Sequence, residues 1–344
     1  CALVFTIHNL AYQGICGHEV FRIYGVRDAA FESDGVEYYG DFNPMKAGIG
    51  YSDRFNAVSV TGARDMATKK YGYGLEGFIG LHKRRLSGIL NGIDHDVWNP
   101  ETDPALFQKY SIENPGSKRE NKRQLQKQLG LEPKGVALYG VVSRLDHIKG
   151  TDLLIPAAEK IIKSGGQLVI LGKGSSAYER ALKNLEKDFP GRISVHLGFN
   201  DVLARRIYAA SDMFLMPSRY EPCGIGQLIA MRYGSVPVVH KVGGLADTVR
   251  DEAAHHGAGT GFTYGTDSAN AFIRAIAKSL RMFKTDREGW KRLVKRAMSY
   301  DSTWDRSAES YLSLYQEALS ERALGRAKTR QDRKDAESER KAIT

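Results

Sequence analysis

The second half of the chain alternates short apolar segments with amphipathic ones, and this rhythm restricts the fold more than any other feature. Each short run is nearly all apolar, which predicts a buried strand, and the segments between them carry apolar residues at helical spacing. Strands that alternate with helices favour an α/β fold whose parallel sheet is covered on both faces. The predicted strands are 136–142, 167–171, 193–197, 213–216 and 236–240, and the predicted helices are 153–162, 178–187, 202–210, 224–233 and 245–251.

The first 93 residues are less regular. Short β-rich runs predict strands at 3–7, 55–60 and 87–93, and 61–70 is predicted to be a helix. Segment 11–50 is rich in glycine and aromatic residues and has little periodicity, so we expect loops and short helices at a cleft there rather than core. The chain opens inside a predicted strand and without an initiator Met, so we expect the true start of this domain to lie upstream.

A length of 344 residues is enough for two domains, each with its own core. Four prolines followed by a charged run favour a connection between them. The last 24 residues hold 8 Lys/Arg and 5 Asp/Glu and few large apolar side chains, which predicts a polar helix or a disordered tail. The expected parts are an incomplete N-terminal domain at 1–93, a connection at 94–134, a second domain at 135–300, a C-terminal helix at 301–320 and a polar tail at 321–344.

The chain carries 50 Lys and Arg against 40 Asp and Glu, a net charge of +10. This balance suits an anionic ligand such as a phosphate ester, and it suits nucleic acid only where cations cluster on one face. We expect no nucleic-acid partner, because the charged run at 118–127 is typical of a solvated helix face. No stretch approaches the ~18 apolar residues of a membrane span. The cysteines, Cys1, Cys16 and Cys223, are too few and too irregularly spaced for a disulfide framework or a zinc site.

Ligands of open α/β sheets bind at the carboxyl ends of the strands, so the loops that follow the strands are the candidate site. After strand 136–142, Arg144 and Lys149 flank a turn and Gly150 opens a helix. A fixed Arg and Lys can clamp phosphate oxygens, the Arg as a planar fork and the Lys as a point charge. The alternative is a surface loop whose cations are solvated.

The loop after strand 213–216 contains Glu221 and Pro222, and Pro222 fits the first turn of a helix. Gly224 and Gly226 let a ligand approach the backbone, and the free N–H groups of a helix start favour an anion. Glu221 either accepts hydrogen bonds from a sugar hydroxyl or caps the helix. After strand 236–240, the pair Gly243-Gly244 either lies against a phosphate or merely joins strand to helix.

Two residues near the strands of the first domain complete the candidates. His8 follows the first strand, where a lone histidine is more often a structural residue with its hydrogen bonds satisfied. Asn91 and Gly92 lie at the end of segment 87–93, where such a pair usually forms a turn.

Taken together, these segments resemble those of the bacterial glycogen synthase and plant starch synthase family, which are retaining glucosyltransferases. The match runs in family order over about residues 3–315. Its most specific part joins Glu221-Pro222-Cys223-Gly224 to Ser143-Arg144-Leu145 and Lys149-Gly150. The other matching segments are Phe5–Gly14, Met45–Ile49, Tyr71–Gly77, Leu90–Asp94, Trp98–Pro100, Glu120–Arg123 and Gly243–Thr248.

The resemblance implies two Rossmann-like domains facing a cleft, the GT-B glycosyltransferase fold, with the N-terminal domain incomplete. It implies transfer of glucose from ADP-glucose, held mainly by the C-terminal domain, to an α-1,4-glucan such as glycogen or a starch primer. It implies no metal and no other cofactor, and a location in the bacterial cytoplasm or alternatively in a plastid.

The resemblance also implies roles for single residues. Arg144 and Lys149 would hold the donor diphosphate and offset its charge as the bond to the sugar breaks. Glu221 would bind glucose hydroxyls, and His8 would touch the transferred glucose from across the cleft. The remaining roles are donor-sugar contact for Asn91, base stacking for Phe199, and backbone contacts to sugar and phosphate for Cys223, Gly224, Ile225 and Gly226.

Some positions depart from the family pattern. The family's N-terminal Lys-x-Gly-Gly-Leu motif and a carboxylate before the His-Asn segment are absent, and Gly226 stands where Thr is usual. Val60 and Gly62 replace a Pro and a Tyr. Two alternatives therefore stay open: a non-catalytic homologue that binds glucan or nucleotide, and a UDP-glucose-dependent glycosyltransferase. The Glu-Pro-Cys-Gly segment argues against the second.

Overall fold

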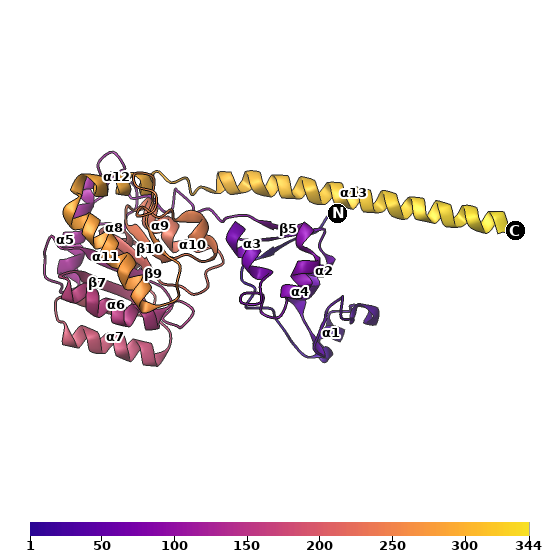
Figure 1. Ribbon diagram of the computed structural model, residues 1–344, viewed down its shortest axis with the longest axis horizontal. Coiled ribbons are helices and arrows are strands. Elements are labelled where there is room, and N and C mark those ends of the chain that lie inside the picture. The colour runs from indigo at the N-terminus through magenta and orange to yellow at the C-terminus, as the bar shows by residue number, and fades with distance from the viewer. Residues whose placement is uncertain (344) are drawn as a thin grey trace. The chain divides into compact units, whose positions relative to one another are not determined.

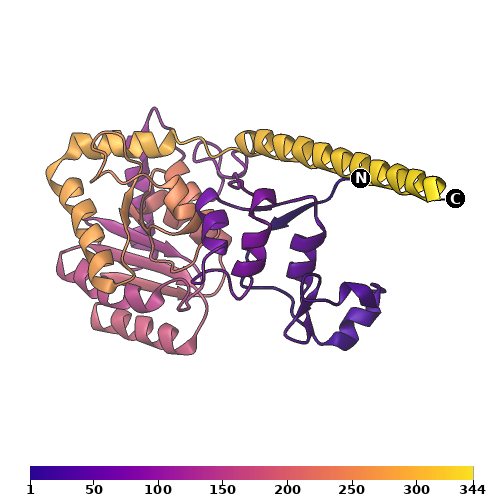
Figure 2. The same cartoon turned by 45° about the vertical axis from the view of Figure 1, so that its right-hand side comes forward.

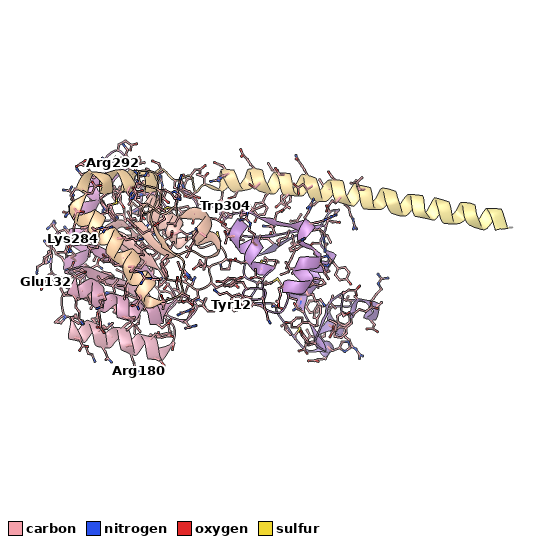
Figure 3. The ribbon with its side chains drawn as sticks, in the orientation of Figure 1. Tyr12, Glu132, Arg180, Lys284, Arg292 and Trp304 are labelled. Atoms are coloured by element: carbon pink, nitrogen blue, oxygen red, sulfur yellow. The ribbon has the colours of Figure 1, made fainter. Side chains whose placement is uncertain are left out.

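The computed structural model describes the backbone of residues 1–343 and the side chains of residues 1–324 (Figures 1 and 3). The chain forms two compact units. The first combines Cys1–Leu90 with Asp305–Thr344, and the second is Asn91–Trp304. The predicted α/β class with parallel sheets is confirmed, because each unit contains a parallel sheet joined by helices.

The second unit is built on a six-stranded parallel sheet with the order β11-β10-β9-β6-β7-β8. The chain enters at the interior strand β6, adds β7 and β8 on one side, and then returns to add β9, β10 and β11 on the other. The order therefore reverses between β6 and β9. The strands are β6 Leu138–Val142, β7 Gln167–Gly172, β8 Ile193–Leu197, β9 Met213–Met216, β10 Val236–His240 and β11 Phe262–Tyr264.

Helices of the second unit pack in two groups around this sheet (Figure 1). Helix α6 contacts α7 and α11, whereas α8 contacts α5 and α9. Strand β7 is buried along its whole length, as expected for a sheet covered on both faces, and Arg180 of α7 points outward (Figure 3). The helices are α5 Lys118–Gln128, α6 Thr151–Lys163, α7 Ser176–Asp188, α8 Asp201–Ala210, α9 Gly226–Arg232, α10 Gly243–Thr248, α11 Ala269–Thr285 and α12 Arg287–Met298.

Residues 94–134, expected to be a connection, lie within the second unit. The expected solvated face of 118–127 is wrong for part of α5, because Lys118 and Lys122 are buried. The Lys118 ammonium donates to the carbonyls of Tyr208 and Ala209 at 3.1 and 2.7 Å, so it satisfies acceptors that the end of α8 leaves open. Burial lowers the pKa of Lys118 to about 7.

The first unit holds a three-stranded parallel sheet with the order β1-β4-β5. Its strands are shorter than predicted, since β4 ends at Ala57 and β5 at Gly88. Segment 11–50 also contains a small core of Phe21, Val36 and Phe42, so the expectation that it holds no core is wrong. The elements are β1 Val4–Ile7, α1 His18–Ile23, β2 Glu37–Tyr38, β3 Asp41–Phe42, α2 Pro44–Tyr51, β4 Arg54–Ala57, α3 Val60–Met66, α4 Glu76–Leu81 and β5 Leu86–Gly88.

The last helix, α13, runs from Trp304 to Ile343 as one continuous element in both views (Figures 1 and 2). The structure therefore does not separate the predicted helix 301–320 from the predicted tail 321–344, because one helix continues to residue 343. Residue 344 lies outside the described residues. The helix packs on the first unit, where Tyr311 lies 3.3 Å from Asn56 and Glu321 pairs with Arg54 at 3.0 Å. Arg322 pairs with Asp53 at 3.5 Å.

We expect the two units to differ in protection from hydrogen exchange. Both β1 and β5 have a neighbour on one side only within the described sheet, whereas β6, β7 and β9 are each paired on both sides. Amides of the interior strands should exchange through global unfolding, and those of β1 and β5 through smaller openings, at rates at least about tenfold faster. Hydrogen-exchange mass spectrometry measures this difference, and equal protection of the two sheets would contradict it.

Candidate functional site

The loops after β6 and β9 meet where the strand order reverses, which is the position at which open parallel sheets bind ligands. Lys149 ends the loop after β6 and Glu221 lies in the loop after β9. Their side chains form an ion pair, with 2.5 Å between Nζ and Oε2. Only 9% of the glutamate side chain and 20% of the lysine side chain are exposed. The structure thus brings together two residues that the sequence placed at separate strand ends.

Glu221 is held by more than this ion pair. Ser218 Oγ donates to the same carboxylate oxygen at 3.0 Å, and the Ser218 carbonyl lies 2.9 Å from Nδ1 of buried His240. The alternative role of Glu221 as a helix cap is wrong, because α9 begins at Gly226 with Ile225 as its N-cap. Pro222, expected in the first turn, precedes the helix for the same reason.

Gly243 and Gly244 pack against the loop that carries Glu221. A Cβ on Gly243 would collide with the Glu221 carbonyl, and one on Gly244 with the Cys223 carbonyl. The Gly244 amide donates to the Glu221 carbonyl at 3.1 Å. These glycines therefore support the carboxylate loop, and because they form the first turn of α10, the predicted helix 245–251 begins too late and ends beyond Thr248.

Arg144 is more exposed than Lys149. Its side chain is 51% exposed, and its Nη1 lies 3.2 Å from Oδ2 of Asp146. Asp146 also accepts from the Lys149 amide at 2.8 Å, which makes the loop a tight turn. Gly150 closes this turn with φ +72° and approaches the Pro217 carbonyl so closely that a Cβ would collide with it. The two cations thus stand at one sheet edge and each pairs with a carboxylate, Lys149 partly buried and Arg144 half exposed.

Arg219, which the sequence did not single out, joins the loops around this edge. Its guanidinium binds both carboxylate oxygens of Asp152 at 2.6 and 2.7 Å and one of Asp267 at 2.9 Å. It also donates to the His147 carbonyl at 2.8 Å, and its amide donates to the Ile148 carbonyl at 2.8 Å. The only sequence signal is an arginine two residues before Glu221, which no local rule connects to Asp152 or Asp267.

Two buried amide oxygens lie near Cys223 without a partner among the described residues: Oδ1 of Asn91 and Oε1 of Gln227. The backbone of Asn91 hydrogen-bonds the Cys223 thiol, and Nε2 of Gln227 lies 3.3 Å from the Cys223 carbonyl. A buried amide oxygen normally accepts a hydrogen bond. Each oxygen therefore keeps an unused acceptor within the described residues, and Asn91 also contacts Cys223 through its backbone.

The remaining predicted residues differ in surroundings. Phe199 follows β8 and is 94% exposed, so its ring is available for stacking. Ile225 is half exposed, and a Cβ on Gly226 would lie 3.4 Å from its nearest neighbouring atom, so a side chain fits there. His8 belongs to the first unit and is exposed after β1. Because His8 has no hydrogen bond, ion pair or ring contact with the described residues, its alternative role as a satisfied structural histidine is wrong.

Replacing Arg219 with alanine should destabilise the second unit by about 2 kcal/mol, because Asp152 and Asp267 lose charged hydrogen bonds. Hydrogen bonding to Arg219 lowers the pKa of Asp152, so this stabilisation is full above the ordinary aspartate pKa of about 4 and is lost as pH falls below it. Urea unfolding at pH 7 and pH 3 measures both effects. If wild type and Arg219→Ala differed by the same free energy of unfolding at both pH values, the assignment would be contradicted. Arg219→Lys should recover part of the stability that Arg219→Ala loses.

Burial raises the pKa of the Cys223 thiol to about 11. Because the thiolate is the reactive form, iodoacetamide should label Cys223 slowly at pH 8 and faster only as the pH approaches 11. The exposed Cys1 is an internal control and should react at pH 8. Peptide mass spectrometry follows both sites, and equal labelling of Cys1 and Cys223 at pH 8 would show that this thiol is accessible.

Residues 1–343 contain no helix that is both long and apolar enough to cross a bilayer. Within the described part of the chain, no three His, Cys, Asp or Glu side chains gather closely enough to hold a metal ion.

Comparison with protein families gives two matches. Residues 1–80 match the starch synthase catalytic domain, and residues 122–296 match glycosyl transferases group 1. A glycogen synthase of Desulforudis audaxviator is 44% identical over 318 residues, which are 92% of this chain and 64% of that protein. A glycogen synthase of Geotalea uraniireducens is 46% identical over 318 residues, 92% of this chain and 66% of that protein. The chain thus spans slightly less than two thirds of the length of these curated relatives.

Two solved structures are also similar to this chain. The catalytic domain of starch synthase IV from Arabidopsis thaliana was solved with ADP and acarbose. It has a TM-score of 0.88 at 36% identity, and the match covers 93% of this chain and 67% of the starch synthase chain. A sucrose-phosphate synthase from Thermosynechococcus elongatus has a TM-score of 0.57 at 20% identity, with coverages of 92% and 68%. At that identity the second likeness concerns the fold alone.

Proposed function

Because the chain belongs to the group 1 glycosyl transferases, and within them to the glycogen and starch synthases, we propose that the protein transfers glucose from ADP-glucose to the non-reducing end of an α-1,4-glucan with retention of configuration. The fold is of the GT-B glycosyltransferase class. The observation that carries the proposal is the Lys149–Glu221 ion pair at the reversal of strand order.

Lys149 and Arg144 are proposed to hold the donor diphosphate. An ammonium has three donors, and within the described residues the Lys149 ammonium makes one hydrogen bond, to Glu221. Two donors therefore remain for phosphate oxygens. Arg144 lies in the same loop, is half exposed and adds a planar fork of N–H groups. Negative charge accumulates on the diphosphate as the bond to glucose breaks, and two fixed cations stabilise that charge most in the transition state.

Glu221 is proposed to act on the sugar rather than on the phosphates. Its carboxylate is buried and held by Lys149 and Ser218, so its position is fixed before a substrate binds. A fixed carboxylate accepts hydrogen bonds from glucose hydroxyls and stabilises positive charge on the sugar ring as the donor bond breaks. The unpartnered oxygen of Asn91 is suited to a second sugar hydroxyl. Backbone groups of the loop Cys223–Gly226 are proposed to bind sugar and phosphate.

The other assignments rest on the family motifs. Phe199 is proposed to stack on the nucleotide base, which its exposure permits. His8 is proposed to contact the transferred glucose, and its support is its exposed position in the family's His-Asn segment. The bacterial origin of the glycogen synthases compared above supports a bacterial cytoplasm rather than a plastid as the location.

An assay of glucose transfer tests the proposal. Purified protein containing this chain is given ADP-glucose or UDP-glucose with a glycogen primer, and nucleoside diphosphate release and primer elongation are measured. We expect both products with ADP-glucose and at least about tenfold lower kcat/KM with UDP-glucose. Faster transfer from UDP-glucose would favour the UDP-glucose-dependent alternative. Glucan binding without either product would favour the non-catalytic one.

A further inference from the structure

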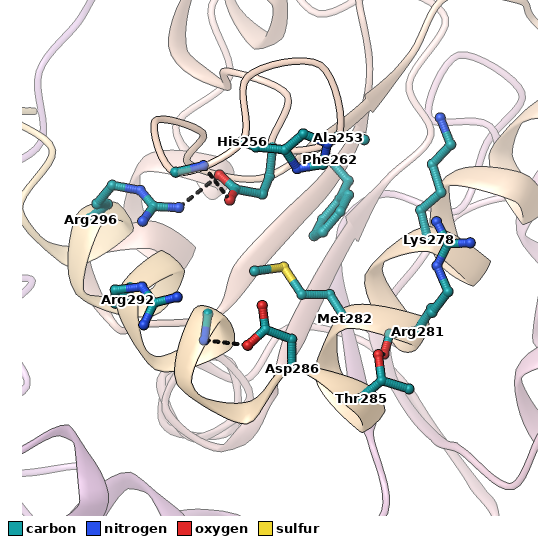
Figure 4. A pocket seen from close by; sticks show the side chains of 13 residues that line it. Ala253, His256, Phe262, Lys278, Arg281, Met282, Thr285, Asp286, Arg292 and Arg296 are labelled. Carbon is teal, nitrogen blue, oxygen red and sulfur yellow. Dashed lines mark hydrogen bonds and ion pairs between the residues drawn. The ribbon is translucent and has the colours of Figure 1, made fainter.

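A cavity of about 350 Å³ opens between α11, α12 and the loop that precedes β11 (Figure 4). Its inner surface is apolar, because the Phe262 ring and the Met282 side chain face it. Cations surround this apolar surface. They are Lys278 and Arg281 from α11, and Arg292 and Arg296 from α12.

One carboxylate of the cavity wall is fully engaged by its surroundings. Glu252 is 4% exposed and accepts from Arg296 Nη2 at 2.7 Å. The amides of Gly257 and Gly259 donate to its two oxygens at 2.9 and 2.8 Å. Glu252 therefore neutralises Arg296 and leaves the other three cations of the cavity opposed by one further carboxylate.

The second carboxylate, Asp286, accepts from the Gly289 amide at 2.8 Å and caps α12. Within the described residues, no ion pair reaches Lys278, Arg281 or Arg292. The cavity therefore has an excess of positive charge, with four cations against two carboxylates.

The spacing of these cations works against the helices that carry them. Lys278 and Arg281 are three residues apart on α11, and Arg292 and Arg296 are four residues apart on α12. Like charges at these spacings face one another and repel, which disfavours an isolated helix. A bound anion would reduce the repulsion on α11, whereas on α12 Glu252 already neutralises Arg296.

The cavity is separate from the candidate active site. Helix α11 begins next to Asp267, which pairs with Arg219 at the carboxyl edge of the sheet, and it ends at Thr285 in the cavity wall. At 1.5 Å per residue, the helix spans about 24 Å between these ends. A ligand of this cavity therefore does not touch Lys149 or Glu221.

We propose that this cavity binds a phosphate dianion, either free or carried as a monoester on a small sugar. Lys278 and Arg281 lie on one side of the cavity and Arg292 lies on the other (Figure 4). An arginine from either side supplies a planar fork that matches phosphate oxygens, and Lys278 adds a point charge. Pockets for small molecules have volumes of about 300–1,000 Å³, so this one lies at the size of a sugar monophosphate rather than of a nucleotide sugar. The carbon atoms of such a sugar pack on Phe262 and Met282.

Calorimetric titration of the protein with inorganic phosphate and with fructose 6-phosphate tests the proposal. We expect saturable binding of at least one probe. The double variant Arg281→Gln/Arg292→Gln should weaken it about 10- to 100-fold, because two charge-assisted hydrogen bonds are lost. The matched control Arg274→Gln/Lys295→Gln removes two exposed cations from the same helices outside the cavity and should leave the affinity within about twofold.

The arms of the experiment separate the possible ligands. Tighter binding of fructose 6-phosphate than of phosphate identifies the monoester as the ligand, and equal affinity identifies free phosphate. Three results would overturn the proposal: no saturable binding of either probe, equal weakening in the matched control, or binding that Arg144→Gln/Lys149→Gln abolishes, since that variant removes cations of the candidate active site alone.

Discussion

Lys149→Ala should lower turnover with ADP-glucose by about 10²–10³, the usual cost of removing one fixed electrostatic donor to a transition state. The reason is the position of its ammonium, 2.5 Å from Glu221 and with donors to spare at the reversal of strand order. Steady-state kinetics at saturating donor measure the loss. Arg144→Ala should cost less than Lys149→Ala, because the Arg144 side chain is half exposed and its charge is screened by water.

A matched control separates this role from a general effect of positive charge. Lys173 follows β7 at the same edge of the sheet and is exposed. Lys173→Ala removes the same charge and should leave turnover within about twofold. Near-normal turnover of both Lys149→Ala and Arg144→Ala would show that the diphosphate is held elsewhere, and an equal loss in Lys173→Ala would point to long-range electrostatics.

Glu221→Gln should lower turnover far more than donor affinity, by about 10²-fold or more in kcat. The glutamine keeps the shape of the side chain and can still accept hydrogen bonds from Lys149 and Ser218. It removes the negative charge, which stabilises the sugar most when its bond to the diphosphate breaks. Kinetics of the variant beside its equilibrium affinity for ADP-glucose separate the two effects.

Two outcomes would reassign Glu221. Loss of affinity with wild-type turnover at saturation would make it a ground-state binding residue. A reduced thermal stability with little change in kinetics would make it a purely structural partner of Lys149. A double-mutant cycle with Lys149→Ala supports the assignment if the two losses are strongly non-additive, because residues in one ion pair act on the same step.

The strands of the second unit were predictable because a parallel sheet covered on both faces requires short, nearly continuous apolar runs. Four of the five strand predictions there match the observed strands to within a residue, and the fifth, 136–142, begins two residues before β6. Strand β11 escaped prediction because it has three residues, one of them a threonine. The hairpin of β2 and β3 is shorter still, and its pairing depends on the local core around Phe42 rather than on a pattern.

The candidate site was predictable only in part, for a different physical reason. Arg144, Lys149 and Glu221 stand at strand ends, and the topology of a parallel sheet brings such ends to one edge. The partners of Arg219 are 67 and 48 residues away in sequence, so no local pattern reveals them. The start of α9 was misjudged because Pro222 fits a first helical turn, whereas the chain keeps an irregular loop up to Ile225.

The first unit is discontinuous, since its final helix arrives only after the whole of the second unit. On a ribosome, Arg54 and Asp53 emerge about 270 residues before their partners Glu321 and Arg322. At ordinary synthesis rates this delay is roughly 10–50 s, long compared with the folding of a single domain. The contacts between β4 and the final helix therefore form only after the whole second unit has been synthesised, so the first unit is the last to be completed.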